Sequence, residues 1–250
     1  MKQSNATVAY DFIRKRILSG EYPPDKPLIT EQLSSDIGIS RTPIKEALLQ
    51  LETDGLVVNR ARLGASVKRL DFREFRELSF VRLALESQAA GLAAIYRTED
   101  DLLEMQYTYE SMQRLTEKIL VREDESVVTG LLNDDVRFHI AVMTAAKNDL
   151  LKKEILRLHL INRVAYYGKV LIDPEWEAAG KVERDTDRRT VLKFHEEIYL
   201  AIVQKDSKTA KSKMEDHIQH MIDVGLRAVS SLKSGVTLRQ LTPEELAYTP

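Results

Sequence analysis

After Asp71 this chain of 250 residues carries almost no strand signal. Apolar residues recur there at helical spacing, as at Leu151, Ile155 and Leu158, and short connectors such as "RTED" and "QKD" separate the periodic stretches. Short connectors favour antiparallel neighbours. The pattern predicts an antiparallel all-α bundle of about six helices, near 72–96, 98–120, 126–146, 148–168, 186–204 and 206–231. The polar stretch 172–187 is expected to be a long connector, and "TPEE" to begin a short helix in the tail.

The one clear strand signal is "LVVNRARLGASVKRL", residues 56–70, where β-branched residues flank Gly64. Gly64 can adopt the positive φ of a tight turn, so we expect a two-stranded hairpin. Three short helical stretches precede it, "VAYDFIRKRILSG", "TEQLSSDIG" and "SRTPIKEALLQLETDG", and each ends at a glycine. Helices followed by a hairpin predict a winged helix-turn-helix. The expected domains are 1–70, this winged unit; 71–232, the bundle; and 233–250, a C-terminal tail.

The third of these helices carries the residues expected to read DNA. In a winged helix-turn-helix its N-terminal part enters the major groove. An arginine there can take O6 and N7 of guanine, and basic residues of the hairpin suit the phosphate backbone or the minor groove. Each residue alone could equally be a helix cap or a solvated surface group. The expected DNA-binding residues are Ser40, Arg41, Thr42, Lys45, Arg60, Arg62 and Gly64.

Charge and composition narrow the class of protein further. Residues 1–70 carry a net charge of +3 and residues 71–250 a net charge of −5, which places a basic module on an acidic body. There is no cysteine, so disulfides, thiolate zinc sites and cysteine nucleophiles are excluded. The first residues lack the pattern of a signal peptide, and no run approaches the roughly 18 apolar residues of a membrane span. We expect a cytoplasmic protein with no membrane contact.

Histidines and one acid are spaced as metal ligands would be. Asp135 and His139 lie four residues apart, on one face of a helix. His195 and His217 each lie 11 residues from Asp206, so they are level on two antiparallel helices. Imidazole with carboxylate suits zinc, nickel, manganese or iron. Each histidine alone could be an ordinary core or surface residue, and the spacing does not establish that the two helix pairs face each other.

A family resemblance bears on both halves. "ILSGEY", "SRTPIKEAL", "LETDGLV" and Gly64 closely resemble the DNA-binding domain of the GntR family of bacterial transcription regulators. The resemblance covers about 60 residues, with two departures. Lys45 stands where many members have arginine, and Glu31 stands where some have a basic residue. "DVRFH", "FHEEIYLAI" and "MEDHI" look like ligand segments of the FCD domain of FadR-type GntR regulators, in its metal-binding, VanR-like branch.

The resemblance implies a site. Carried over position by position, the metal ligands are Asp135, His139, His195 and His217, with zinc as the favoured ion. Arg82 matches an arginine that reaches the effector cavity in relatives, where it would suit a carboxylate. The alternative for Arg82 is a salt bridge with Glu86, four residues on. Arg163 is a weaker candidate for effector binding.

We therefore expect a transcription regulator and not an enzyme. Its operator affinity would be controlled by a small carboxylate effector bound next to a divalent metal. It would act as a homodimer on a pseudo-palindromic double-stranded operator, because symmetric half-sites match two-fold symmetry. Two alternatives are a metalloenzyme with a DNA-binding appendage, and a sensor for which the metal ion itself is the signal. No nucleophile motif or general base paired to the site supports the enzyme.

Overall fold

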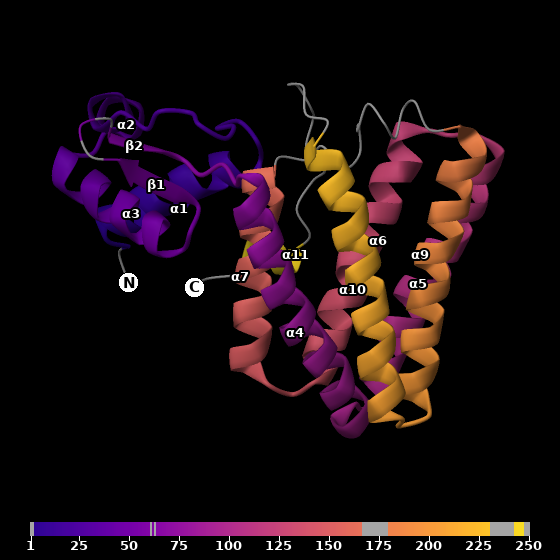
Figure 1. Ribbon diagram of the computed structural model, residues 1–250. Helices are drawn as coiled ribbons and strands as arrows, with labels where there is room; N and C mark the ends of the chain where they lie inside the picture. The colour runs from indigo at the N-terminus through magenta and orange to yellow at the C-terminus, as the bar shows by residue number, and fades with distance from the viewer. Residues whose placement is uncertain (1–2, 61, 63, 167–179, 231–242, 248–250) are drawn as a thin grey trace.

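The computed structural model describes residues 3–60, 62, 64–166, 180–230 and 243–247, and in them two helical parts lie side by side (Figure 1). The N-terminal part is a small helical unit with one hairpin, and the second part is a bundle of long helices. The predicted fold class, mainly α with a winged helix-turn-helix and an antiparallel bundle, is confirmed.

The winged unit is built from α1 (Asn5–Leu18), α2 (Thr30–Ile37), α3 (Arg41–Thr53), β1 (Val57–Arg60) and β2 (Gly64–Val67). The strands pair antiparallel, from Val57 opposite Val67 to Arg60 opposite Gly64. Gly38 ends α2 at a φ of 74°, and Gly64 begins β2 at a φ of 80°, values that glycine adopts without a Cβ penalty. The apolar stripe of α3, with Ile44, Leu48 and Leu51, is buried, and this leaves its opposite face in solvent.

Six helices form the bundle in the described part of the chain: α4 (Phe72–Tyr96), α5 (Glu99–Val121), α6 (Glu125–Ala145), α7 (Asp149–Tyr166), α9 (Lys181–Val203) and α10 (Ser207–Ser230). A capping box between Asp71 and Glu74 starts α4, so the bundle begins where the wing ends. α4 packs along α10, and α5 packs against both α6 and α9. The short helix expected in the tail is α11 (Pro243–Ala247).

One predicted boundary is wrong. α9 begins at Lys181, so residues 181–187 are helix and not connector. Their polarity has a tertiary cause: Arg184 pairs with Glu123 before α6, and Asp187 pairs with His220 of α10. The rest of the expected connector, 172–179, lies outside the described residues.

The winged unit and the bundle share one apolar core. Ile13 of α1 and Leu51 of α3 belong to the same buried cluster as Ile140 of α6 and Ile155 of α7. Where the two parts meet, Gly55 has a φ of 81°, and a Cβ built on it would lie 2.8 Å from Cδ1 of Ile161 on α7. The winged unit therefore packs directly on α7.

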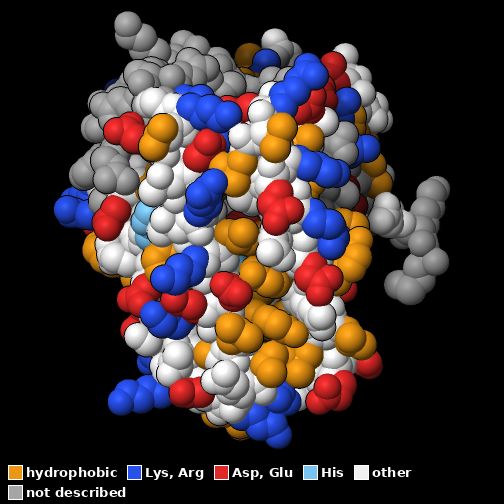
Figure 2. Space-filling model, turned by 90° about the vertical axis from the view of Figure 1, so that its right-hand side faces the viewer, with side chains coloured by type: hydrophobic (Ala, Val, Ile, Leu, Met, Phe, Trp, Pro, Cys, Tyr) orange, Lys and Arg blue, Asp and Glu red, His pale blue; other side chains and the backbone are white. Residues whose placement is uncertain are grey.

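The bundle surface carries apolar side chains on one face. Figure 2 shows them gathered over the lower half of the face on the right of Figure 1, where α5 and α9 lie. Exposed apolar residues of these helices include Leu103, Tyr107 and Leu200, which are 63%, 56% and 44% exposed.

One described segment, Arg73–Tyr96 of α4, is long and apolar enough to cross a membrane by length and composition alone, and 44% of its most apolar window is buried inside the protein. A single helix of this kind is weak evidence for a membrane span, since a core helix meets the same criterion.

Candidate metal centre

Four side chains from three helices converge in the middle of the bundle. Asp135 and His139 lie one turn apart on α6, His195 lies on α9 and His217 lies on α10. One oxygen or nitrogen atom of each lies within 4.8 Å of the corresponding atoms of the other three. All three histidines are buried, and Asp135 is partly exposed. The structure thus brings together all four residues predicted as ligands.

The hydrogen bonds around the rings determine which nitrogen faces the centre. Nδ1 of His195 donates to the carbonyl oxygen of Val191 at 2.8 Å, so its Nε2 carries the lone pair. Nδ1 of His139 lies 3.0 Å from Oε2 of Glu86, and its Nε2 lies 3.1 Å from Nε2 of His217. A metal-ligating histidine usually donates its other ring N–H to a carboxylate or a carbonyl, as His195 does here.

Several polar atoms at the centre lie close to other polar atoms but form no hydrogen bond with them. Nε2 of His195 lies 3.1 Å from Oδ1 of Asp135, but both atoms are acceptors when Nδ1 carries the ring proton. Among the described residues, Nδ1 of His217 is buried without a partner, and the contact of His139 with Glu86 is not aimed as a straight hydrogen bond. Lone pairs that face each other across about 3 Å repel unless a proton or a metal ion lies between them. Three imidazoles and one carboxylate therefore fit a divalent ion.

The pKa directions of His217 and Asp135 agree with this set, whereas the pKa of His139 is raised, because the contact with Glu86 and the charges of Glu86 and Asp135 outweigh its burial. Burial, together with the positive charges of His195 and His139, holds the pKa of His217 well below its usual value, so its ring is neutral and free to coordinate. Burial alone would raise the pKa of Asp135, but the contact with His195 and the charges of His139 and His217 outweigh it and lower that pKa. Asp135 is therefore ionised, as a ligand must be.

Glu86 of α4 connects the centre to two further groups. Its Oε1 accepts from Nε of Arg82 at 2.8 Å and lies 2.9 Å from Nε2 of His159 on α7. The Glu86 side chain is 1% exposed. Burial would raise its pKa, but the charges of Arg82 and His159 and the contact with His139 hold it well below the usual value. Glu86 is therefore a buried carboxylate shared by three helices, a role that sequence spacing did not reveal.

Arg82 was expected to reach the effector cavity, and the structure instead gives the alternative, the pair with Glu86. Its Nη2 also lies 3.2 Å from Nε2 of His159. Arg82 is absent from the described residues that line the cavity beside the metal centre. Arg163 lies in α7, and its side chain is outside the described part of the chain.

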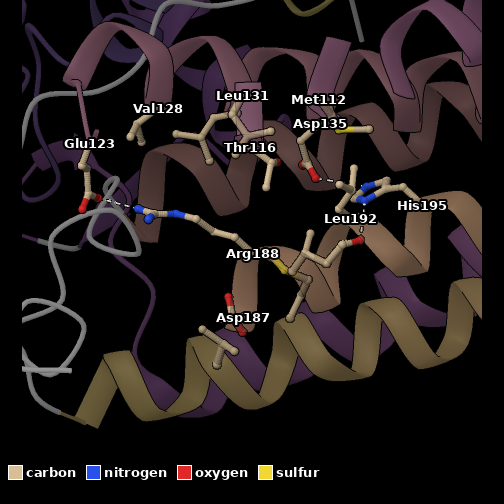
Figure 3. A pocket seen from close by; sticks show the side chains of 14 residues that line it. Met112, Thr116, Glu123, Val128, Leu131, Asp135, Asp187, Arg188, Leu192 and His195 are labelled. Atoms are coloured by element: carbon tan, nitrogen blue, oxygen red, sulfur yellow. Dashed lines mark hydrogen bonds and ion pairs between the residues drawn. The ribbon is translucent and has the colours of Figure 1, made fainter. Parts of the chain in front are cut away.

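The cavity has a volume of about 150 Å³ and opens onto Asp135 and His195 (Figure 3). Its walls are largely apolar, with Met112, Leu131 and Leu192 among them. Of the lining residues that the structure describes, Arg188 is the one cation, and its guanidinium pairs with Glu123 at 2.5 Å. Sequence reasoning did not single out Arg188, because only the packing of the helices brings it to the cavity.

The predicted DNA-binding residues lie on one exposed part of the winged unit. Arg41 and Lys45 project from the exposed side of α3, next to Ser40, its N-cap, and Thr42. Nη1 of Arg41 lies 3.1 Å from Oε1 of Glu31. At the hairpin, Arg60, Arg62 and Gly64 are exposed, and Arg62 has a φ of 69°.

Comparisons with known proteins agree with both halves. Residues 5–67 match the family described as "Bacterial regulatory proteins, gntR family", and residues 77–220 match the FCD domain. Similar proteins include the uncharacterized HTH-type transcriptional regulator YdhC of Bacillus subtilis, 26% identical over 84% of this chain and 86% of YdhC. The HTH-type transcriptional repressor RspR of Escherichia coli is 25% identical over 85% of each chain.

Among solved structures, E. coli McbR/YncC matches with a TM-score of 0.64 and 22% identity, over 90% of this chain and 99% of that one, which supports the fold. The relatives of this chain regulate transcription, so the protein is a DNA-binding transcription regulator and not an enzyme. It belongs to the gntR family of bacterial regulatory proteins, in the group whose C-terminal effector-binding domain is an FCD domain.

Proposed function

We propose that this regulator senses a small carboxylate effector bound next to a divalent metal ion, with zinc favoured and nickel, manganese or iron as alternatives. The observation that carries the proposal is the convergence of one carboxylate and three buried imidazoles, each with an oxygen or nitrogen atom within 4.8 Å of the others. Asp135, His139, His195 and His217 would hold the ion. When bound, the ion supplies a Lewis acid for an anionic oxygen.

The chain's own residues define the rest of the site. Glu86 and the Val191 carbonyl orient His139 and His195, so that each ring keeps its lone pair toward the centre. The apolar cavity beside Asp135 and His195 excludes water from the effector and strengthens its charge interactions. The effector would act by preferring one arrangement of the bundle, which α7 transmits to the winged unit seated on it.

The DNA contacts and the dimer belong to the same proposal. Arg41 and Lys45 would read base edges in the major groove, with Ser40 and Thr42 beside them, and Arg60 and Arg62 would contact the backbone beside the hairpin turn at Gly64. The protein would bind a pseudo-palindromic operator as a homodimer in the bacterial cytoplasm. The exposed apolar residues Leu103, Tyr107 and Leu200 support a dimer contact on the α5–α9 face, because a monomer leaves them in water.

Metal content and its removal test the proposal. Elemental analysis of the purified protein should find one divalent ion per chain, and chelation should lower the melting temperature, because the ion cross-links three helices. His195→Ala and His217→Ala should lose the ion and the effector response but still bind operator DNA. His220→Ala is the matched control, since His220 lies one turn from His217 and pairs with Asp187 outside the centre. A protein with no ion, or His220→Ala behaving like His217→Ala, would contradict the assignment.

A sensor for the metal alone is the second candidate, since four protein ligands can complete a tetrahedral site. Titrating metal and organic acid separately in an operator-binding assay distinguishes the two. A change in operator affinity on metal addition, with no further change on acid addition, would favour the metal sensor.

A further inference from the structure

The cavity next to the metal centre has two chemically different ends. Asp135 and His195 lie at one end, and Arg188 with Glu123 lies at the other (Figure 3). Arg188 and His195 are seven residues apart on α9, which places their backbones roughly 10 Å apart along the helix at about 1.5 Å per residue. The walls between the two ends are mainly apolar. The cavity therefore has mainly apolar walls and charged groups at both ends, and Asp187 is a further carboxylate in its lining.

Arg188 is a buried cation. Its side chain is 10% exposed and projects from α9 to line the cavity. Burying a guanidinium is costly unless an anion and hydrogen bonds compensate it. Its partners include Glu123 at 2.5 Å and, more distantly, Asp185 at 3.5 Å.

Glu123 is more exposed to solvent than Arg188. Its side chain is 44% exposed, and it stands between the end of α5 at Val121 and the start of α6 at Glu125. Arg184, one turn before Arg188, also contacts it, at 3.5 Å. A half-exposed carboxylate outside regular helix can return to water at small cost, whereas the buried guanidinium cannot. An incoming carboxylate can therefore take the place of Glu123 on Arg188.

We propose that Arg188 binds a second acid group of the effector in place of Glu123, so that the effector is an elongated dicarboxylate with an apolar middle. This inference rests on the proposed function, in which the metal end takes the first carboxylate. A planar guanidinium recognises a carboxylate with two parallel hydrogen bonds, and the ligand's acid reproduces the pairing that Glu123 supplies. The cavity volume of about 150 Å³ suits a slender aliphatic or monocyclic spacer, since an apolar cavity of about that size holds benzene.

Three acids test the inference by calorimetry on the full-length, zinc-loaded protein. Suberate has two carboxylates joined by an aliphatic chain of about the required length, octanoate has the same length with one carboxylate, and succinate has two carboxylates on a short chain. Suberate should bind at least about tenfold more tightly than either, which is the usual contribution of a charge-assisted hydrogen bond. Equal affinities for suberate and octanoate would overturn the inference.

Two variants test whether Arg188 binds the second carboxylate and whether Glu123 competes with it. Arg188→Gln should remove the preference for suberate and leave octanoate binding unchanged, which also shows that the cavity is intact. Glu123→Gln should raise the affinity for suberate several-fold by removing the internal competitor, with no effect on octanoate. Arg114→Gln, at an exposed arginine of α5, is the matched control and should change neither.

Failure of this inference is separable from failure of the proposed function. If Arg188→Gln keeps the preference for suberate, or if suberate does not bind at all, Arg188 is not an effector residue. Metal content and the effect of chelation on melting, measured on the same samples, report on the metal site independently of any acid.

Discussion

Replacing Glu86 by glutamine tests whether the buried carboxylate orients the metal centre. Its two oxygens contact three groups: Nδ1 of His139 at 3.0 Å, Nε2 of His159 at 2.9 Å and Nε of Arg82 at 2.8 Å. A glutamine offers one acceptor oxygen and turns N–H donors toward groups that are donors themselves. Glu86→Gln should therefore release His139 from its orientation and leave Arg82 without its buried anion.

The expected magnitudes follow from these contacts. Loss of a carboxylate behind a metal-ligating histidine lowers metal affinity about 10- to 100-fold, or about 1.4–2.8 kcal/mol. Removal of one member of a buried ion pair costs about 3–5 kcal/mol of unfolding free energy, and Arg82, at 16% side-chain exposure, should lie at the low end. Zinc affinity is measured by competition with a chromophoric chelator, well below the melting temperature, with folding checked by circular dichroism.

Glu77→Gln is the matched control. Glu77 lies on the same helix and also pairs with an arginine, Arg73, but both side chains are exposed, so neither metal affinity nor stability should change measurably. If Glu86→Gln folds and binds zinc as tightly as the natural protein, Glu86 does not orient His139, and its carboxylate has no part in preparing the metal centre.

Two further predictions concern the winged unit. Gly55→Ala should lower the melting temperature by about 2–8 °C, because a residue with a Cβ pays about 1–2 kcal/mol for a positive φ and the new Cβ would also meet Ile161. Gly38→Ala is the control: it carries the same φ penalty, but its Cβ would lie in open space, so it should lower the melting temperature less. Arg41→Ala should abolish the preference for operator over random DNA in a gel-shift titration, whereas Arg62→Ala should weaken binding to both alike and reduce the salt dependence; equal effects of the two substitutions on both DNAs would contradict the assignment.

Local patterns were sufficient to predict most of the helices. The range expected for the first bundle helix, 72–96, is the range of α4, because a capping box begins it and helical periodicity continues to its end. The α9 start was missed because residues 181–187 are polar, and their partners, Glu123 and His220, are distant in sequence. The helical spacing of apolar residues indicates which positions are buried against apolar neighbours, but it gives no information on ion pairs between helices.

The same limit applies to the site. The heights of His195 and His217 about a turn, with the four-residue step from Asp135 to His139, made these residues candidates, and the family resemblance was needed to join them into one ligand set. Glu86 could not be assigned from sequence, because its contacts come from α6 and α7, and only packing brings those helices against α4. For Arg82 the structure shows the pair with Glu86 that was its alternative, and its effector role stays a prediction, since nothing local distinguishes a cavity arginine from one paired four residues on.

The core shared by the winged unit and the bundle limits how this protein could be recombined with others. Ile13 and Leu51 pack in one cluster with Ile140 and Ile155, so the DNA-reading part separated from its partner would present an apolar surface to water. An exchange of sensory domains would succeed only if the new domain carried a matching α7 face, with a side chain that fits over Gly55. In this chain the winged unit and the bundle are packed as one block, although each matches a family of its own.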